Sequence, residues 1–200
     1  LGVSSLQLES PERGFSFTRE GPLDMRLDPN LQVKALDLIN ILSRKELYEL
    51  FKNLGEEKYS KRLADALVLA REVNQFQTTK QLADFVQRVV GGRGGQPAGR
   101  RGKIHPATKV FQALRIAVND ELNTLREGLG QVKDLIEKDG HILVISFHSL
   151  EDRIAKFTFR QWADLGLGQI LTKKPIIPSE IEIRENPRSR SAKLRVFKIL

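Results

Sequence analysis

The sequence has no cysteine, three histidines, one tryptophan and one methionine. Without cysteine, a disulfide framework, a cysteine-based zinc site and a cysteine nucleophile are excluded. The histidines, His105, His141 and His148, are widely spaced, which argues against a dedicated metal site. No apolar run approaches the length of a membrane-spanning helix, and no signal-peptide pattern is present. With 200 residues, the chain is long enough to bury a real core as one domain or as a domain carrying an insertion.

Positive charge is in surplus, with a formal net charge of +8. Such a surplus favours a polyanionic partner, nucleic acid first and an anionic membrane second. A merely basic enzyme would carry the same charge, so the placement of the cations is more informative. Two places stand out: the basic Gly-rich segment 91–103, and the segment 184–198, which contains the turn Asn-Pro-Arg-Ser-Arg-Ser.

The segment 140–153 is the stretch around which the chain is organised. Its apolar run 142–145 is short and β-branched, which predicts a strand covered on both faces, as in a parallel α/β sheet. Ser146-Phe147-His148-Ser149 follows at once, and Ser149 with Asp152 predicts a capping-box start for the next helix. Ligands bind beyond the carboxyl ends of strands in open α/β sheets. The polar cluster is therefore a candidate site, although satisfying backbone groups in a strand–helix turn would explain it equally well.

Hydrophobic spacing predicts four successive helices over 31–42, 43–54, 57–73 and 78–91, with no strand between them. Ser43 and Glu46 form a capping-box pattern at the second. The segment 91–103 follows a helix and lacks the Gly-Lys-Ser/Thr ending, so it is not a nucleotide-triphosphate loop. It is a linker, an arm for RNA phosphates, or both. Further elements are predicted: helices over 105–125, 132–138 and 150–163, and strands over 169–173 and 194–200.

The first 28 residues are predicted to be mostly loop. Phe15 and Phe17 alternate there with arginines, a combination that suits stacking on, and phosphate contact with, an unpaired nucleotide. The competing interpretation is a loop pinned over the domain edge by these two rings.

Seven segments recur together, in this order, in one family of proteins. They are Leu-Gly-Val-Ser-Ser-Leu-Gln-Leu at 1–8, Arg-Gly-Phe-Ser-Phe at 13–17, Gly-Pro-Leu-Asp-Met-Arg at 21–26, Lys-Ile-His-Pro-Ala-Thr at 103–108, Phe-Gln-Ala-Leu-Arg-Ile at 111–116, Ile-Ser-Phe-His-Ser-Leu-Glu-Asp-Arg at 145–153 and Asn-Pro-Arg-Ser-Arg-Ser at 186–191. Each alone is weak, but the ordered set spans the chain and is specific. The sequence resembles the S-adenosylmethionine-dependent methyltransferases that modify a cytosine N4 atom of small-subunit ribosomal RNA near the decoding centre, the RsmH or MraW family.

The resemblance implies an α/β fold: a class I, Rossmann-like methyltransferase sheet with an inserted helical subdomain. It assigns 1–30 and 104–200 to the methyltransferase domain, 31–91 to the inserted substrate-recognition subdomain and 92–103 to a basic linker. It also implies S-adenosyl-L-methionine as cofactor, small ribosomal subunit (16S) RNA as partner, the cytoplasm as location and no membrane contact; a homodimer is a candidate assembly. The family's glycine-rich cofactor turn and ribose-binding acid have no counterpart here. We therefore expect a missing N-terminal piece that carries the first strands, and weak cofactor binding by this chain alone.

The resemblance also suggests site residues. The glutamine of the family's Val-Ser-Ser-x-Gln motif maps onto Gln7, with Ser4 and Ser5 beside it, as cofactor contacts. We expect Ser4, Ser5, Asp24 and His148 to line the base pocket, with His148, Asp24 and Ser5 as catalytic candidates. The predicted RNA contacts are Phe15, Phe17, Arg26, Arg100, Arg101, Arg188 and Arg190.

The expected chemistry needs no strong base, because the excess proton on N4 can leave after methyl transfer. Catalysis then rests on placing N4 in line with the methyl group and excluding water. A different class of answer is a non-catalytic RNA-binding or ribosome-assembly protein on a methyltransferase-like fold. A hydrolase using Ser146 or Ser149 with His148 ranks far below, since glycines of a nucleophile elbow do not surround either serine.

Overall fold

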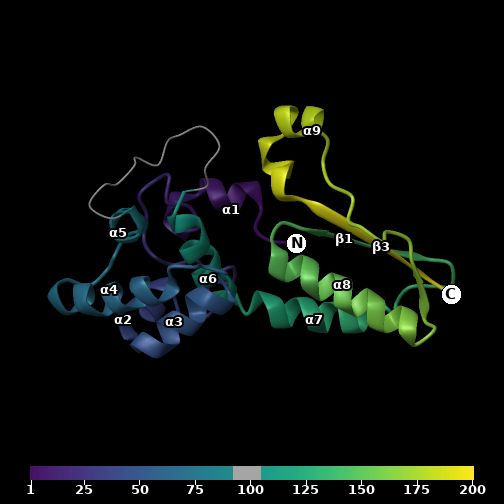
Figure 1. Ribbon diagram of the computed structural model, residues 1–200, viewed down its shortest axis with the longest axis horizontal. Coiled ribbons are helices and arrows are strands. Elements are labelled where there is room, and N and C mark those ends of the chain that lie inside the picture. The colour runs from purple at the N-terminus through teal and green to yellow at the C-terminus, as the bar shows by residue number, and fades with distance from the viewer. Residues whose placement is uncertain (92–104) are drawn as a thin grey trace. The chain divides into compact units, whose positions relative to one another are not determined.

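The computed structural model describes residues 1–91 and 105–200, which divide into two compact units (Figure 1). The helical unit comprises Val3–Asp120, and the sheet unit comprises Leu1–Gly2 with Glu121–Leu200. The structure contains both helices and a β-sheet, which confirms the predicted α/β class. No helix in the described ranges is both long and apolar enough to cross a membrane.

The helical unit contains the four predicted helices. In order, its elements are α1 (Ser5–Glu9), η1 (Pro11–Arg13), α2 (Ala35–Ile41), α3 (Arg44–Asn53), α4 (Ser60–Val73), α5 (Thr79–Gly91) and α6 (Ala107–Asn119). The capping box at α3 is present as predicted: the Ser43 hydroxyl accepts from the Glu46 N–H at 3.3 Å, and the Glu46 carboxylate accepts from the Ser43 N–H at 2.7 Å. The short α1 falls in a stretch predicted to be loop.

The N-terminal loop belongs to the core of this helical unit. Leu23 and Met25 are 1% and 0% exposed and lie in one hydrophobic cluster with residues of α2 to α6. Asn119 at the end of α6 holds the same loop, since its Oδ1 accepts from the Leu27 N–H at 2.6 Å and its Nδ2 donates to the Met25 carbonyl at 2.7 Å. The predicted boundaries at residues 30 and 104 therefore do not coincide with the two units, because long-range packing joins both flanks to the helices.

The long helix predicted over 105–125 is two helices. Asp120 has a left-handed backbone, with φ at 47°, and ends α6 before α7 (Glu121–Val132) begins. Apolar periodicity continues across this break, so the spacing could not reveal it. The helix predicted over 132–138 is not formed: Val132 ends α7, and residues 133–138 are turns and irregular chain.

The sheet unit is built on three strands, β1 (His141–Ser146), β2 (Gly168–Ile170) and β3 (Lys193–Ile199), in the order β1-β3-β2. Both pairings are antiparallel, with Ile142 opposite Phe197 and Ser146 opposite Lys193. The composition of the run 142–145 favoured a parallel sheet, whereas its pairing with β3 is antiparallel. The run 142–145 and the closing strand were correctly located, but an apolar run does not specify the direction of its neighbour.

One face of β1 is covered and the other is exposed. Ile142 and Val144 are buried against α7 and α8 (Ser149–Asp164), together with Phe159, Trp162 and Phe197. On the opposite face, Leu143 and Ile145 are 61% and 46% exposed. The prediction of burial on both faces is therefore not met by the described residues. A last pair of elements, α9 (Glu180–Glu185) and η3 (Pro187–Ser191), leads into β3.

Candidate functional site

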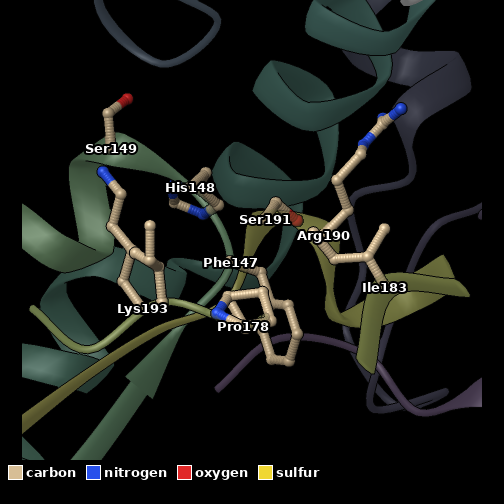
Figure 2. Close-up of a pocket in the computed structure, with 10 residues that line it drawn as sticks. Phe147, His148, Ser149, Pro178, Ile183, Arg190, Ser191 and Lys193 are labelled. Atoms are coloured by element: carbon tan, nitrogen blue, oxygen red, sulfur yellow. The ribbon is translucent and has the colours of Figure 1, made fainter. Parts of the chain in front are cut away.

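A pocket of about 320 Å³ opens at the carboxyl end of β1 (Figure 2). Because β1 and β3 are antiparallel, this end of β1 lies beside the start of β3, where Ser146 pairs with Lys193. The pocket is lined by Phe147, His148, Ser149, Ile177, Pro178, Ile183, Arg190, Ser191, Ala192 and Lys193. Two stretches singled out in the sequence, Ser-Phe-His-Ser and Asn-Pro-Arg-Ser-Arg-Ser, thus meet at one place.

The lining of this β1-end pocket combines positively charged side chains with one aromatic ring. Lys193 and Arg190 supply positive charge, and no carboxylate lines the pocket. Arg190 is exposed and makes no ion pair with any described residue. Phe147 is 40% exposed and lies beside Pro178 in Figure 2, so an aromatic face and an apolar ring line the same hollow. Such a combination suits a nucleotide, whose phosphate needs cations and whose base needs a flat apolar partner.

His148 caps helix α8. Its Nδ1 accepts from the Glu151 N–H at 3.4 Å, and the Glu151 carboxylate accepts in return from the Phe147 N–H at 2.8 Å. The predicted cap at Ser149 is therefore corrected by one residue: Ser149 is the first residue of the helix and His148 is its cap. The sequence pattern misled because serine is the commoner cap, whereas here the imidazole nitrogen fills that role.

Glu121, His148 and Glu151 bring potential metal ligands within 4.8 Å of one another. The helix cap competes with a metal for His148, because an Nδ1 that accepts an N–H leaves the proton of a neutral imidazole on Nε2. That nitrogen lies 3.6 Å from Glu151 Oε1, and a protonated nitrogen offers no lone pair to a cation. The cluster is thus a buried imidazole facing a carboxylate, and it fixes the start of α8.

Asp152, one turn into α8, ties the helix to β3. Its carboxylate accepts from Arg195 Nε at 2.7 Å and from Arg195 Nη2 at 3.2 Å, and it lies 3.6 Å from Lys193 Nζ. Burial of the carboxyl acts to raise the pKa of Asp152, but the hydrogen bonds and charges of Arg195 and Lys193 outweigh it and leave that pKa below its ordinary value. Asp152 thereby holds Lys193 at the pocket while neutralising buried Arg195.

The predicted cofactor residues lie at the start of the helical unit, where two of them bond to each other. The Gln7 Oε1 accepts from the Ser4 N–H at 2.9 Å, and the Ser4 hydroxyl accepts from the Gln7 N–H at 3.2 Å. This capping box begins α1 and engages the side-chain oxygen of Gln7. The amide nitrogen of Gln7 and the hydroxyl of exposed Ser5 can make other contacts.

Asp24 and Arg26 form a loop clamp in the helical unit. Arg26 Nε and Nη2 donate to the two Asp24 carboxylate oxygens at 2.7 and 2.8 Å, and Arg26 Nη1 donates to the carbonyls of Pro29 and Leu31. Burial acts to raise the pKa of Asp24, yet the Arg26 hydrogen bonds and charge hold it below its ordinary value. Asp24 was predicted to be catalytic and Arg26 to contact RNA. In the structure the hydrogen-bonding groups of both side chains are engaged in holding the loop.

The two phenylalanines of the loop pack on the helical unit, Phe15 in its core and Phe17 against it. Phe15 is 7% exposed and belongs to the hydrophobic cluster of the helical unit. Phe17 is half-buried, with its ring centroid 4.7 Å from His105 and 4.9 Å from Phe111. These contacts agree with the competing interpretation of a pinned loop, and burial leaves the Phe15 ring little free face for a base.

Of the predicted arginines, Arg190 lines the β1-end pocket, and Arg188 is exposed in the adjoining η3. Arg100 and Arg101 lie outside the described residues. Sequence reasoning named Phe147 only as a member of the Ser-Phe-His-Ser cluster and did not name Lys193. Lys193 precedes the predicted strand 194–200 by one residue, and its place opposite Ser146 depends on the register with β1, which the sequence does not show.

Fold and site together define an α/β protein with a cationic, nucleotide-sized pocket at a strand end. The family model described as the MraW methylase family matches residues 1–200, and the chain belongs to this family. Curated relatives include proteins named ribosomal RNA small subunit methyltransferase H from Persephonella marina, 54% identical over 99% of the chain, and from Coprothermobacter proteolyticus, 49% identical over 99%. The relative of that name from a Synechococcus strain is 52% identical over 98% of the chain. The chain spans 66%, 64% and 58% of these three proteins, respectively.

Proposed function

We propose that the protein takes part in S-adenosylmethionine-dependent methyl transfer to the N4 amine of a cytidine in small-subunit (16S) ribosomal RNA. The observation that carries this proposal is the match of the family over residues 1–200, with relatives named as methyltransferases of that RNA. The β1-end pocket adds physical support, because its cations and exposed ring suit an RNA nucleotide. A cytoplasmic location follows from the same substrate.

Within the proposed reaction, this chain supplies the RNA side of the site. Arg190 and Lys193 bind phosphate oxygens, and Phe147 offers a face to the extruded base. His148, proposed above for the base pocket, acts by holding residues 147–149 at the start of α8. Placement of the amine is the larger part of the work, since a misplacement of about 1 Å can cost about a hundredfold in rate.

The described residues do not complete a cofactor site. The β1-end pocket has no acidic lining, so it does not suit a sulfonium cation, and Gln7 has its oxygen engaged in the α1 cap. Gln7, Ser4 and Ser5 remain the proposed contacts toward the cofactor, through the Gln7 amide nitrogen and the Ser5 hydroxyl. We also propose that a Rossmann-like sheet continues at the second edge of β1, where the Leu1 amine already donates to the Ile145 carbonyl at 3.0 Å.

The test is methyl transfer from labelled S-adenosylmethionine to small subunits lacking the modification, using the full-length natural protein. Arg190→Glu is compared with Arg184→Glu, an exposed arginine of α9 that does not line the pocket. We expect Arg190→Glu to raise KM at least about tenfold, which corresponds to about 1.4 kcal/mol of binding, and Arg184→Glu to act like the unchanged protein.

His148 is tested by rescue. Asparagine can cap a helix as well as any residue, so His148→Asn keeps the cap and removes the imidazole, whereas His148→Ala removes both. Full activity in His148→Asn with reduced activity in His148→Ala is the result expected of a positioning residue. Absence of methyl transfer by the unchanged protein, with RNA binding intact, would instead favour the non-catalytic assembly protein.

A further inference from the structure

A second cavity, of about 380 Å³, lies within the sheet unit between α8 and the strands β2 and β3. We call it the α8 groove. Helix α8 contributes exposed Lys156 and Arg160 and buried Phe159, and the segment after β2 contributes Thr172 and Lys173. Lys156 and Arg160 are four residues apart, so they lie one turn apart on the same side of the helix.

The α8 groove is lined by cations and by no carboxylate. Its fourth cation, Arg195, is 7% exposed and is neutralised by Asp152 through two hydrogen bonds. Lys156, Arg160 and Lys173 form no ion pair with any described residue, and Lys156 lies 5.8 Å from the centre of the exposed Phe157 ring. Three uncompensated charges around one hollow repel one another, which an anion would relieve.

The groove also presents a hydroxyl donor. The Thr172 Oγ1 accepts from the Val196 N–H at 2.9 Å, so its own proton is directed elsewhere and can be donated to an anion. The cavity falls within the range of about 300–1,000 Å³ typical of ligand pockets, and it therefore has room for a sugar-phosphate unit as well as a small ion.

Asp152 connects the α8 groove to the β1-end pocket. Its Oδ1 binds Arg195, which lines the groove, and its Oδ2 lies near Lys193, which lines the pocket. Lys193 and Arg195 are two residues apart on one strand, about 6.6 Å along it. The two hollows thus follow each other along α8 and β3 at the scale of neighbouring nucleotides, and the Asp152 carboxylate between them is already paired.

We propose that Lys156, Arg160 and Lys173 bind the sugar-phosphate backbone of the RNA strand whose target nucleotide enters the β1-end pocket. The inference rests on the proposed function for the identity of the RNA. In this proposal the groove strengthens RNA binding and fixes the direction of the strand, since phosphate contacts position a nucleic acid without recognising its sequence.

The experiment measures binding of a small-subunit ribosomal RNA transcript to the full-length protein at several salt concentrations. The groove variant carries Lys156→Gln, Arg160→Gln and Lys173→Gln. The control variant carries Lys138→Gln, Lys174→Gln and Arg184→Gln, exposed cations of the same unit that do not line the groove, so both variants lose three positive charges. Unchanged thermal unfolding midpoints check that both fold.

Each lost contact with single-stranded RNA lowers the slope of log affinity against log salt by about 0.7, so we expect the groove variant to lose about 2. At physiological salt its affinity falls tenfold or more, whereas the control variant stays within about twofold of the unchanged protein. Methyl transfer should show a raised KM with kcat retained, because the groove holds the strand and does not touch the reacting atoms.

Equal slopes in the two variants would overturn the inference, because general charge would then account for the effect. Equal loss of binding to polyglutamate would overturn it as well, since the groove would then be an anion site without preference for RNA. Failure of the proposed function would show separately, because the unchanged protein would then transfer no methyl group. The salt dependence of RNA binding by the two variants would still test whether the groove binds RNA.

Discussion

The half-buried carboxylate of Asp152 offers the sharpest test of how the sheet unit is held together. In Asp152→Ala, the guanidinium of Arg195 loses both hydrogen bonds while it stays in a site where the residue is 7% exposed. Removing one partner of a fully buried pair costs about 3–5 kcal/mol. The Asp152 side chain is 13% exposed and shared with Lys193, so we place the loss at the low end, at about 3 kcal/mol.

Thermal and urea unfolding measure this loss. For a chain of this size, about 3 kcal/mol corresponds to a fall of about 6–12 °C in Tm. Glu180→Ala is the matched control, because Glu180 pairs with Arg184 at 92% and 80% side-chain exposure and such pairs contribute about 0–1 kcal/mol. Adding Arg195→Met to Asp152→Ala should restore much of the stability, because the unpaired charge is then gone.

The same carboxyl makes an acid-dependent contribution. The folded pKa of Asp152 lies below its ordinary value of 3.8, so its stabilising effect is present above about pH 4 and is lost as pH falls through the folded pKa. The difference in stability between the unchanged protein and Asp152→Asn should therefore shrink on acidification below pH 4. A loss under about 1 kcal/mol in Asp152→Ala at neutral pH, or strict additivity with Arg195→Met, would refute the reasoning.

Two further predictions test packing. A Cβ at Gly168 would come within 2.1 Å of the Lys198 carbonyl oxygen, so Gly168→Ala should lower the free energy of unfolding in urea by about 1–3 kcal/mol. The control is Gly128→Ala on α7, where a Cβ meets open space; it should raise the free energy of unfolding by about 0.5–1 kcal/mol. Phe15→Ala should cost about 3–5 kcal/mol as a core truncation, while Leu6→Ala, at 77% exposure, should stay within about 0.5 kcal/mol; near-equal values would mean that the loop is not part of the core.

The placement of His148 changes how the Ser-Phe-His-Ser segment is understood. A histidine next to serines at a strand end suggests proton transfer, but its Nδ1 is engaged with the backbone N–H of Glu151. The segment's functional contribution then comes through geometry: the cap sets the first turn of α8, which places Phe147 and Ser149 at the pocket and Asp152 against β3. Loss of the cap would disturb all three at once.

Local sequence determined helices α2 to α5 of the helical unit and the position of β1. Apolar spacing and the box of Ser43 with Glu46 predicted α2 to α5 because helix periodicity and capping act within a few residues. The ordered motifs, read along the chain, also identified the family that residues 1–200 match.

Tertiary structure alone decided the strand directions, the membership of the N-terminal loop and the partners of the charged residues. From the sequence alone, Phe15 could stack on a base or pack in the core, and its packing among the helices decides for the core. Asp24 was a candidate catalyst, but in the structure Arg26 donates hydrogen bonds to both of its carboxylate oxygens. Each of these depends on contacts between residues distant in the chain or on the geometry of a folded loop. Residue type and spacing specify local conformation, whereas burial and pairing are settled only when the elements pack.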